Sequence, residues 1–288
     1  MATSPQHTRA LHIEDMPLIE RLLNNSEYVY QRFTLEELPL LLRRYPAVGL
    51  FHRETLQGFL LSQVTNPPTG WISGFGVSWT ESGNYISILN KLLPVLETQL
   101  LRRNVHQLHY SGNDIERDWL QKLLLKWGFV PYSYLYAYDK YDYKIPASGN
   151  QQVTLRPVQI ATDMSALLNL ERLCFEDLWC YDATAFTDIA ATHPYFVVAE
   201  LQQQVIGYQF NALEGDSGYL VRIAVHPHYN SQGIGTRLMA EAVRFFAQEK
   251  VTRIMLNTQE ENLHAHGLYE WFGFIRLQQR GFVLRRTF

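Results

Sequence analysis

The feature of this sequence that most limits its possible folds is a plan that occurs twice along the chain. In the second half, apolar runs at 195–200, 205–214 and 218–225 predict three strands joined by short polar turns, as in an antiparallel meander. A long helix follows, then a strand at 253–258, a helix closed by Gly273, and a final pair of strands within 274–286. The first half repeats this order, with strands at 47–54, 57–64 and 70–77 and a helix from Ile86 to Leu100. A duplicated domain is the simplest explanation.

Local sequence supports the duplication. Trp127-Gly128-Phe129 stands after one helix where Phe272-Gly273-Phe274 stands after another, 145 residues later. Charge, Pro, Ser and Gly interrupt the regular pattern between Lys140 and Gln152, which predicts a boundary. We therefore predict an α+β fold with two tandem domains, residues 1–145 and 151–288. Each has a mixed, mostly antiparallel central sheet flanked by helices.

The start of the second domain is also readable from local signals. Residues 153–158 are expected to form a strand that ends near Pro157. Asp163 is expected to cap the helix that follows, and a second short helix is expected to begin at Asp182.

Composition excludes several classes of partner. The formal net charge is −3 and no cluster of Lys and Arg is present, so nucleic acid is not an expected ligand. No segment approaches the roughly 20 apolar residues that span a bilayer, and no signal peptide is visible, so we expect a cytoplasmic protein without membrane contact. Two cysteines, Cys174 and Cys180, are too few for a disulfide framework and are expected to be reduced.

The segment Val221–Phe246 places two glycines where a strand ends and a helix begins. The first amides of a helix have no partner within it, and the helix dipole adds partial positive charge, so such a loop can bind an anion. Glycine lets the backbone approach a phosphate closely and adopt positive φ. By itself a Gly-x-Gly loop is more often a plain turn, so the flanking sequence has to decide.

The flanking sequence resembles the GNAT superfamily of acyl-CoA-dependent N-acyltransferases. Its pattern combines a V-x-P turn, a Q/R-x-x-G-x-G/A loop and an N-x-x-A-x-x-L-Y-x-x-x-G-F helix, which "VHPHYNSQGIG" and "NLHAHGLYEWFGF" follow over most of Tyr219–Phe274. One position departs from it, because Asn230 stands where Gln or Arg is usual. The first half looks like a tandem copy that has lost the loop: "SWTESGNYIS" carries one glycine, and Leu124 stands at the position of Tyr269.

The resemblance implies an N-acetyltransferase, which belongs to the acyltransferases that transfer groups other than aminoacyl groups. Such an enzyme moves the acetyl group of acetyl-CoA directly to a primary amine within a ternary complex. Tyr269 would act as general acid toward the coenzyme A sulfur, and the backbone N–H of Val225 would stabilise the oxyanion. The expected cofactor-binding residues are Ile223, Ala224, Val225, Asn230, Ser231, Gln232, Gly233, Ile234, Gly235, Thr236, Asn262, Ala265 and Tyr269.

The acceptor side is less defined. Arg222 is a candidate to bind an acidic group of the acceptor, although a surface ion pair is the commoner role for such a residue. Glu176, Tyr181 and Glu214 are further candidate substrate-binding residues. Glu214, Asp216, Glu176 and Asp177 are candidate bases, and removal of the proton by water is the alternative. A small amine and a peptide or protein amine both fit, as does an acyl group longer than acetyl. The chain is expected to be a monomer or a homodimer.

Two other interpretations stay open. A non-catalytic acyl-CoA sensor or a partner-binding protein would keep the loop without using Tyr269, and a purely structural tandem protein would bind no cofactor. His226-x-His228 and His264-x-His266 resemble metal ligands. However, side chains two positions apart on a helix point in directions about 200° apart, and no third ligand has a zinc-like spacing. No metal is therefore expected.

Overall fold

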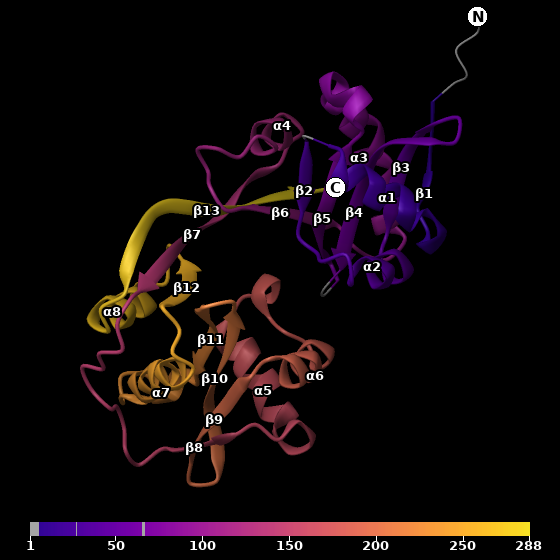
Figure 1. Ribbon diagram of the computed structural model, residues 1–288. Helices are drawn as coiled ribbons and strands as arrows, with labels where there is room; N and C mark the ends of the chain where they lie inside the picture. Colours follow the sequence, from indigo (N-terminus) through magenta and orange to yellow (C-terminus); the bar gives the residue numbers. More distant parts are fainter. Residues whose placement is uncertain (1–5, 27, 65–66) are drawn as a thin grey trace, which may run out of the picture. The chain divides into compact units, whose positions relative to one another are not determined.

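The computed structural model describes residues 6–26, 28–64 and 67–288, and the chain divides into two compact units. Unit 1 contains the described residues up to Gly112, with Arg117–Tyr132 and Val283–Phe288. Unit 2 contains Asn113–Glu116 and Ser133–Phe282. Each unit has its own strands and helices (Figure 1). No helix in the described ranges combines the length and the apolar character that crossing a membrane requires.

Unit 2 is built on a mixed, mostly antiparallel sheet. Its strands lie in the order β13-β7-β12-β11-β10-β9-β8, and among the printed registers only β11 and β12 run parallel. The elements are β7 (Val130–Lys140), β8 (Thr154–Pro157), α5 (Ile160–Cys174), η3 (Asp177–Trp179), α6 (Ala183–Thr192), β9 (Tyr195–Leu201), β10 (Gln204–Glu214), β11 (Ser217–Val225), η4 (Pro227–Tyr229), α7 (Ile234–Gln248), β12 (Arg253–Gln259), α8 (Leu263–Trp271) and β13 (Ile275–Thr287).

Unit 1 follows the same plan. Its strands lie in the order β1-β3-β4-β5-β6, with β5 and β6 parallel and the other printed pairs antiparallel. A short strand, β2, pairs with β5 in addition. The elements are β1 (His7–Ala10), η1 (Ile13–Asp15), α1 (Met16–Asn24), β2 (Val29–Gln31), α2 (Leu38–Arg44), β3 (Ala47–His52), β4 (Thr55–Val64), β5 (Thr69–Val77), η2 (Trp79–Asn84), α3 (Tyr85–Leu101), β6 (Gln107–Gly112) and α4 (Gln121–Lys126). The predicted α+β fold of mixed sheets flanked by helices is confirmed.

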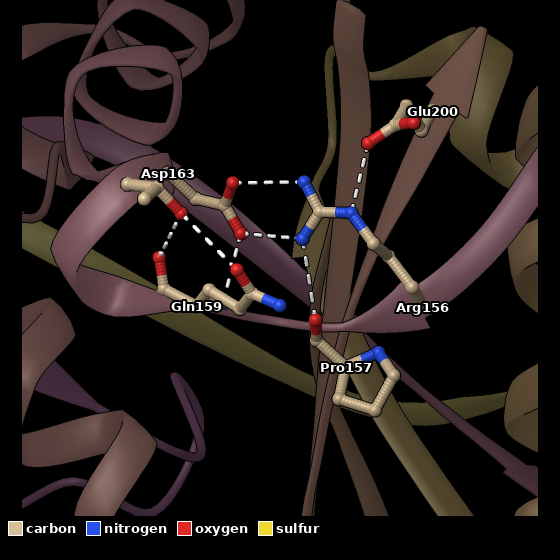
Figure 2. Close-up of polar contacts among 6 residues, drawn as sticks. Arg156, Pro157, Gln159, Asp163 and Glu200 are labelled. Carbon is tan, nitrogen blue, oxygen red and sulfur yellow. Dashed lines mark hydrogen bonds and ion pairs between the residues drawn. The ribbon is translucent and has the colours of Figure 1, made fainter. Parts of the chain in front are cut away.

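An ion pair fixes α5, the first helix of unit 2, to strand β8 (Figure 2). Arg156 on β8 donates to both carboxylate oxygens of Asp163, at 2.8 and 2.9 Å, and to Glu200 on β9 at 2.8 Å. Asp163 also accepts the backbone N–H of Gln159 at 2.8 Å, which gives that helix-terminal donor a partner. The prediction that Asp163 precedes the helix as its N-cap is wrong, because α5 begins at Ile160 with Gln159 as the N-cap and Asp163 lies in the first turn.

Unit 1 contains the same device. Arg9 donates to both oxygens of Asp15, at 2.7 and 2.6 Å, and Asp15 accepts the backbone N–H of His12 at 3.0 Å.

The ends of α4 and α8 also correspond between the two units. Gly128 and Gly273 both adopt left-handed backbone, with φ of 80° and 81°. After each glycine the next N–H reaches back, from Phe129 to the Leu124 carbonyl at 3.1 Å and from Phe274 to the Tyr269 carbonyl at 3.0 Å. Leu124 and Tyr269 thus occupy equivalent positions.

Alternating residues of β9 and β10 cover both faces of the unit 2 sheet. Val198, Tyr208 and Phe210 pack on α5 and α6, whereas Val197 and Ala199 pack on Leu238 and Ile234 of α7. Figure 1 shows α5 and α7 on opposite sides of these strands. The α7 helix is thereby held with its first turn next to the end of β11.

One predicted element is wrong. Residues 274–286 were expected to form a pair of strands, but Ile275–Thr287 is one continuous strand, β13. Gly281 has no positive φ and no turn interrupts the strand. The strand starts in unit 2 and its last residues belong to unit 1. The place beside β12 is taken by β7, whose residues from Ser133 onward belong to unit 2 although they precede the expected boundary at 145–151.

Candidate functional site

Two parallel strands of unit 2 separate after a short paired segment. The pairing of β11 with β12 covers Ser217, Gly218 and Tyr219, which lie opposite residues 253–255. Beyond them, Leu220 and Arg222–Val225 of β11 pair with β10, with a register shift at Val221, but with no residue of β12 in the described chain. We name this opening the β11–β12 gap. An unpaired strand edge presents backbone N–H and C=O groups that a ligand can bind.

Strand geometry indicates which groups face this gap. The N–H of His226 donates to Ile206 of β10 at 2.8 Å. Because backbone groups alternate in direction along a strand, the N–H of Val225 points away from β10, toward the β11–β12 gap. The carbonyl of Val225 accepts the thiol of Cys174 at 3.3 Å. Burial raises the pKa of Cys174 to about 11, so this cysteine is a protonated donor and not a thiolate nucleophile.

The glycine loop leads directly into α7. Gly233 is the N-cap of the helix with φ of 75°, and Ser231 also has positive φ, at 61°. Gly235 lies in the first turn, where an added Cβ would come no nearer than 3.6 Å to Leu268 and 4.0 Å to Val225. Packing of the protein therefore does not require glycine at 235. The open space at this position belongs to a cavity that Gly235 lines.

A cavity of about 780 Å³ opens between these elements. It is lined by the end of β11, the loop and first turn of α7, one side of α8, and the end of α5. Of the expected cofactor-binding residues, all line it except Gln232, whose side chain turns back to the His228 carbonyl at 3.3 Å. The described lining contains no Asp, Glu, Lys or Arg.

Tyr269 and Asn262 enter the cavity from α8. Tyr269 packs edge-on against Tyr138, with 5.8 Å between ring centroids, and no hydrogen-bond partner of its hydroxyl is found among the described residues. Burial raises its pKa above the ordinary value, and Tyr219 and Tyr138 add to the shift. The phenol is therefore protonated at neutral pH. Asn262 caps α8, accepting the N–H of Ala265 at 3.2 Å.

Arg222 does not form a surface ion pair. Its guanidinium donates to Glu171 at 2.6 Å, and the two side chains are 12% and 1% exposed. The rings of Phe175 and Tyr181 lie on the guanidinium, each with its centroid 4.1 Å away. Glu171 also accepts the hydroxyl of Tyr208 and the backbone N–H of Tyr181. Arg222 and Tyr181 thus hold the segment after α5 against β11 and do not line the cavity.

The structure does not bring the other candidate acceptor residues and bases to the cavity. Glu214 is exposed and lies opposite Ser217, at the end of the β10–β11 hairpin farthest from Val225. Asp216 accepts the hydroxyl of Thr252 at 2.9 Å, at the same end. Glu176 and Asp177 are exposed beside η3.

The paired histidines also separate. His264 lines the cavity, whereas His266 is buried and bonds the Tyr138 hydroxyl at 2.7 Å. His226 accepts the backbone N–H of His228 within the turn, at 3.2 Å. Within the described part of the chain, no group of three or more His, Cys, Asp or Glu could hold a metal.

Sequence reasoning missed several lining residues. Leu263, His264, Gly267, Leu268 and Trp271 extend the α8 side of the cavity. The spacing of His264, Leu268 and Trp271 places them on one helix face, which is a signal that could have found them. Leu173 and Cys174 come from the end of α5, and no local pattern relates them to the glycine loop.

Comparison with known proteins agrees with this geometry. Residues 164–274 match the model of the Acetyltransferase (GNAT) family. A Bacillus subtilis protein described as a candidate alanine N-acetyltransferase of ribosomal protein bS18 is 25% identical over 111 residues, 38% of this chain and 74% of that protein. The mycothiol acetyltransferase of Kocuria rhizophila is 26% identical over 155 residues, 47% of this chain and 50% of that protein.

The whole chain shares its fold with solved structures. A tandem GNAT protein from the clavulanic acid biosynthesis pathway matches with a TM-score of 0.69 and 10% identity, over 98% of both chains. Acetyl-CoA is the acetyl donor of the acetyltransferases in this family. With the glycine loop, the β11–β12 gap and the family match on the same residues, the segment 164–274 of this chain is a GNAT superfamily domain.

Proposed function

We propose that this protein is an acetyl-CoA-dependent N-acetyltransferase with one active site, in unit 2. The observation that carries the proposal is the meeting of the β11–β12 gap with the glycine loop in one cavity of about 780 Å³. The strand edge offers backbone groups to an extended arm, and the loop offers amides to a diphosphate. A coenzyme A ester contains both parts, in that order.

The residues present fit this cofactor. Gly233 and Ile234 would bind the diphosphate through their amides, and Gly235 leaves the space for it. Ile223 and Val225 would bind the pantetheine arm along β11, with Asn262 and Ala265 on the opposite wall. Because the described lining has no Lys or Arg, the phosphate charge would be balanced by amides and the helix dipole.

Two groups would carry the chemistry beside the reacting bond. When bound, acetyl-CoA supplies an activated acetyl thioester. The N–H of Val225 would stabilise negative charge at the acetyl oxygen, since it points into the β11–β12 gap. Tyr269 would donate its proton to the departing sulfur as negative charge develops there. Its raised pKa means that the phenol carries this proton at neutral pH, and closeness of the hydroxyl to the sulfur would have to supply the rest.

The amine would lose its proton without a protein carboxylate. No Asp or Glu lines the cavity among the described residues, and the buried Glu171 is fully engaged by Arg222, Tyr208 and Tyr181. We therefore favour removal of the proton by water, with the acceptor amine neutral when it attacks. The rate would then increase with pH until the amine is fully deprotonated.

Unit 1 would be a scaffold without a cofactor site, and β2 supports this role. In unit 1, β5 and β6 separate after Trp71 and His109, as β11 and β12 do in unit 2. The edge of β5 that becomes free is taken by β2, which pairs with Gly74, Phe75 and Gly76. The Tyr30 hydroxyl reaches the Ser111 carbonyl on β6 at 2.9 Å. The position of a pantetheine arm is thus filled by the chain itself.

The acceptor would be a primary amine. The end of α5 and Phe175 wall the cavity with neutral and aromatic groups, so charge on the acceptor is not selected there. The names of the two relatives include an alanine N-acetyltransferase and a mycothiol acetyltransferase, so both a peptide terminus and a small amine are acceptors to screen.

Calorimetric titration of acetyl-CoA tests the binding half of the proposal. We expect one site per chain in the wild type. We expect no measurable binding to Gly235→Leu, because its side chain would occupy the cavity at a position where a Cβ makes only ordinary contacts. Gly83→Leu is the matched control, since it changes a glycine of the corresponding loop of unit 1 where a Cβ meets nothing within 4 Å, and thermal unfolding of both variants checks the fold. Two sites per chain, or none, would contradict the proposal.

Tyr269→Phe separates an enzyme from a binding protein. An enzyme should keep its affinity for acetyl-CoA and lose about 10²- to 10⁴-fold in amine-dependent release of coenzyme A. A sensor would release none in either form. The readout is free thiol, measured with a panel of primary amines.

A further inference from the structure

Residues 148–150 of unit 2, which precede β8, contact the glycine loop and are not among the residues that line the cavity. We infer that Asn150 is a positioning residue that orients the amides of Gly233 and Ile234 toward the diphosphate. This inference rests on the proposed function, because it assigns a role within the same site.

Asn150 holds two consecutive carbonyl groups of the loop. Its side-chain amide donates to the carbonyl of Gln232 at 3.0 Å, and its backbone N–H donates to the carbonyl of Gly233 at 3.0 Å. Its side-chain oxygen accepts the N–H of Gln152 at 2.9 Å, which fixes the side chain itself. The side-chain N–H, the side-chain oxygen and the backbone N–H of Asn150 therefore all form hydrogen bonds. Among side chains of this size, only that of asparagine offers both a donor and an acceptor in this geometry.

The planarity of the peptide bond turns these contacts into an orientation of N–H groups. In a trans peptide the C=O of one residue and the N–H of the next point in opposite directions. When the Gln232 carbonyl points to Asn150, the N–H of Gly233 points away from it. The Gly233 carbonyl accepts the helical N–H of Arg237 at 3.0 Å as well as the backbone N–H of Asn150, so α7 and Asn150 together fix the N–H of Ile234. Gly233 and Ile234 both line the cavity, so the Asn150 side chain orients the Gly233 amide, which would meet the diphosphate, and the Asn150 backbone supports the orientation of the Ile234 amide.

Close backbone contact keeps Asn150 in place. Gly149 has φ of 74°, and an added Cβ would lie 2.3 Å from the backbone nitrogen of Arg237 and 2.7 Å from the Gly233 carbonyl oxygen. No side chain fits there without moving the segment off α7. Residues 148–150 thus form a backing for the loop, further fixed by the contact of Arg244 with Ser148 at 3.5 Å.

Affinity for two ligands separates this role from a general structural one. Coenzyme A contains the diphosphate, whereas pantetheine has the same arm without it. We compare the dissociation constants of both for wild type, Asn150→Ala and Asn150→Asp, by calorimetry for coenzyme A and by ligand-observed NMR for pantetheine. Asn169→Ala, at an exposed position of α5, is the matched control, and thermal unfolding of each variant checks the fold.

We expect Asn150→Ala to weaken coenzyme A binding by about 3- to 10-fold, as for the loss of one hydrogen bond that orders a binding group. Asn150→Asp should weaken it further, because a carboxylate cannot donate to the Gln232 carbonyl and would repel it. Pantetheine affinity and the control should be unchanged. Equal losses for both ligands, or no loss for coenzyme A, would overturn the inference alone. Failure of the wild type to bind coenzyme A would instead remove the proposed function, and this inference with it.

Discussion

Replacing Arg222 with methionine should destabilise unit 2 by about 3 to 5 kcal/mol, which is the usual cost of removing one partner of a buried ion pair. The structure places this pair in that class, because Glu171 is 1% exposed and the variant would leave its side chain buried without the Arg222 cation. Arg222→Met retains much of the apolar contact with Phe175 and Tyr181 and removes the charge. The loss therefore measures the uncompensated carboxylate more than the packing.

Thermal unfolding is the first assay, with hydrogen exchange to locate the effect. For a unit of about 150 residues, 1 kcal/mol corresponds to about 2 to 4 °C, so the transition of unit 2 should fall by about 6 to 20 °C. Amide protection should decrease in α5 and β11, which the pair joins. Arg244→Met is the control, because the Arg244–Glu241 pair is 35% and 25% exposed and should contribute less than about 1 kcal/mol.

A double variant tests the explanation itself. Arg222→Met combined with Glu171→Leu removes both charges, and we expect it to recover most of the stability that the single variant loses. A single variant that behaves like the Arg244→Met control would refute the reasoning, since it would mean that water reaches Glu171. A double variant less stable than the single one would also refute it.

Three further outcomes follow from the contacts described above. Gly128→Ala and Gly273→Ala should each cost about 1 to 2 kcal/mol in urea unfolding, because both positions have φ near 80°, and equal costs would agree with their equivalence. Hydrogen bonding from Arg156 lowers the pKa of Asp163 in the folded state. The stability advantage of wild type over Asp163→Asn should therefore be complete above about pH 4 and should shrink as the pH falls through the folded-state pKa. An advantage that is unchanged down to about pH 2 would contradict this. Tyr30→Ala should destabilise unit 1 by about 2 to 4 kcal/mol in the same urea assay, and the affinity for acetyl-CoA should stay at the wild-type value because the cofactor is assigned to unit 2.

Much of the candidate site could be predicted from sequence because its parts are local. The strand, the glycine loop and the start of α7 lie within one short stretch, and the α8 residues follow a helical spacing. Such patterns depend on backbone dihedrals and on neighbours three or four positions away, which the residue order specifies directly. The repetition of the plan in both halves was readable for the same reason.

The parts that were missed depend on contacts between distant residues. Arg222 and Glu171 are 51 positions apart, and Asn150 and Gln232 are 82 apart. Neither pair has a spacing that marks it, since an Arg on a strand reads as a surface charge until the fold buries it. The single strand β13, and β7 beside β12, were likewise decided by which edge each strand could pair with.

The sequence by itself determined the duplicated α+β plan and the position of the anion-binding loop, because glycine conformation and hydrophobic periodicity are properties of short segments. Only the tertiary structure decided that the edge of β11 stays open while the edge of β5 is filled by β2. That difference arises from long-range pairing, whose free energy comes from burial and hydrogen bonds made across the fold and not from any local preference.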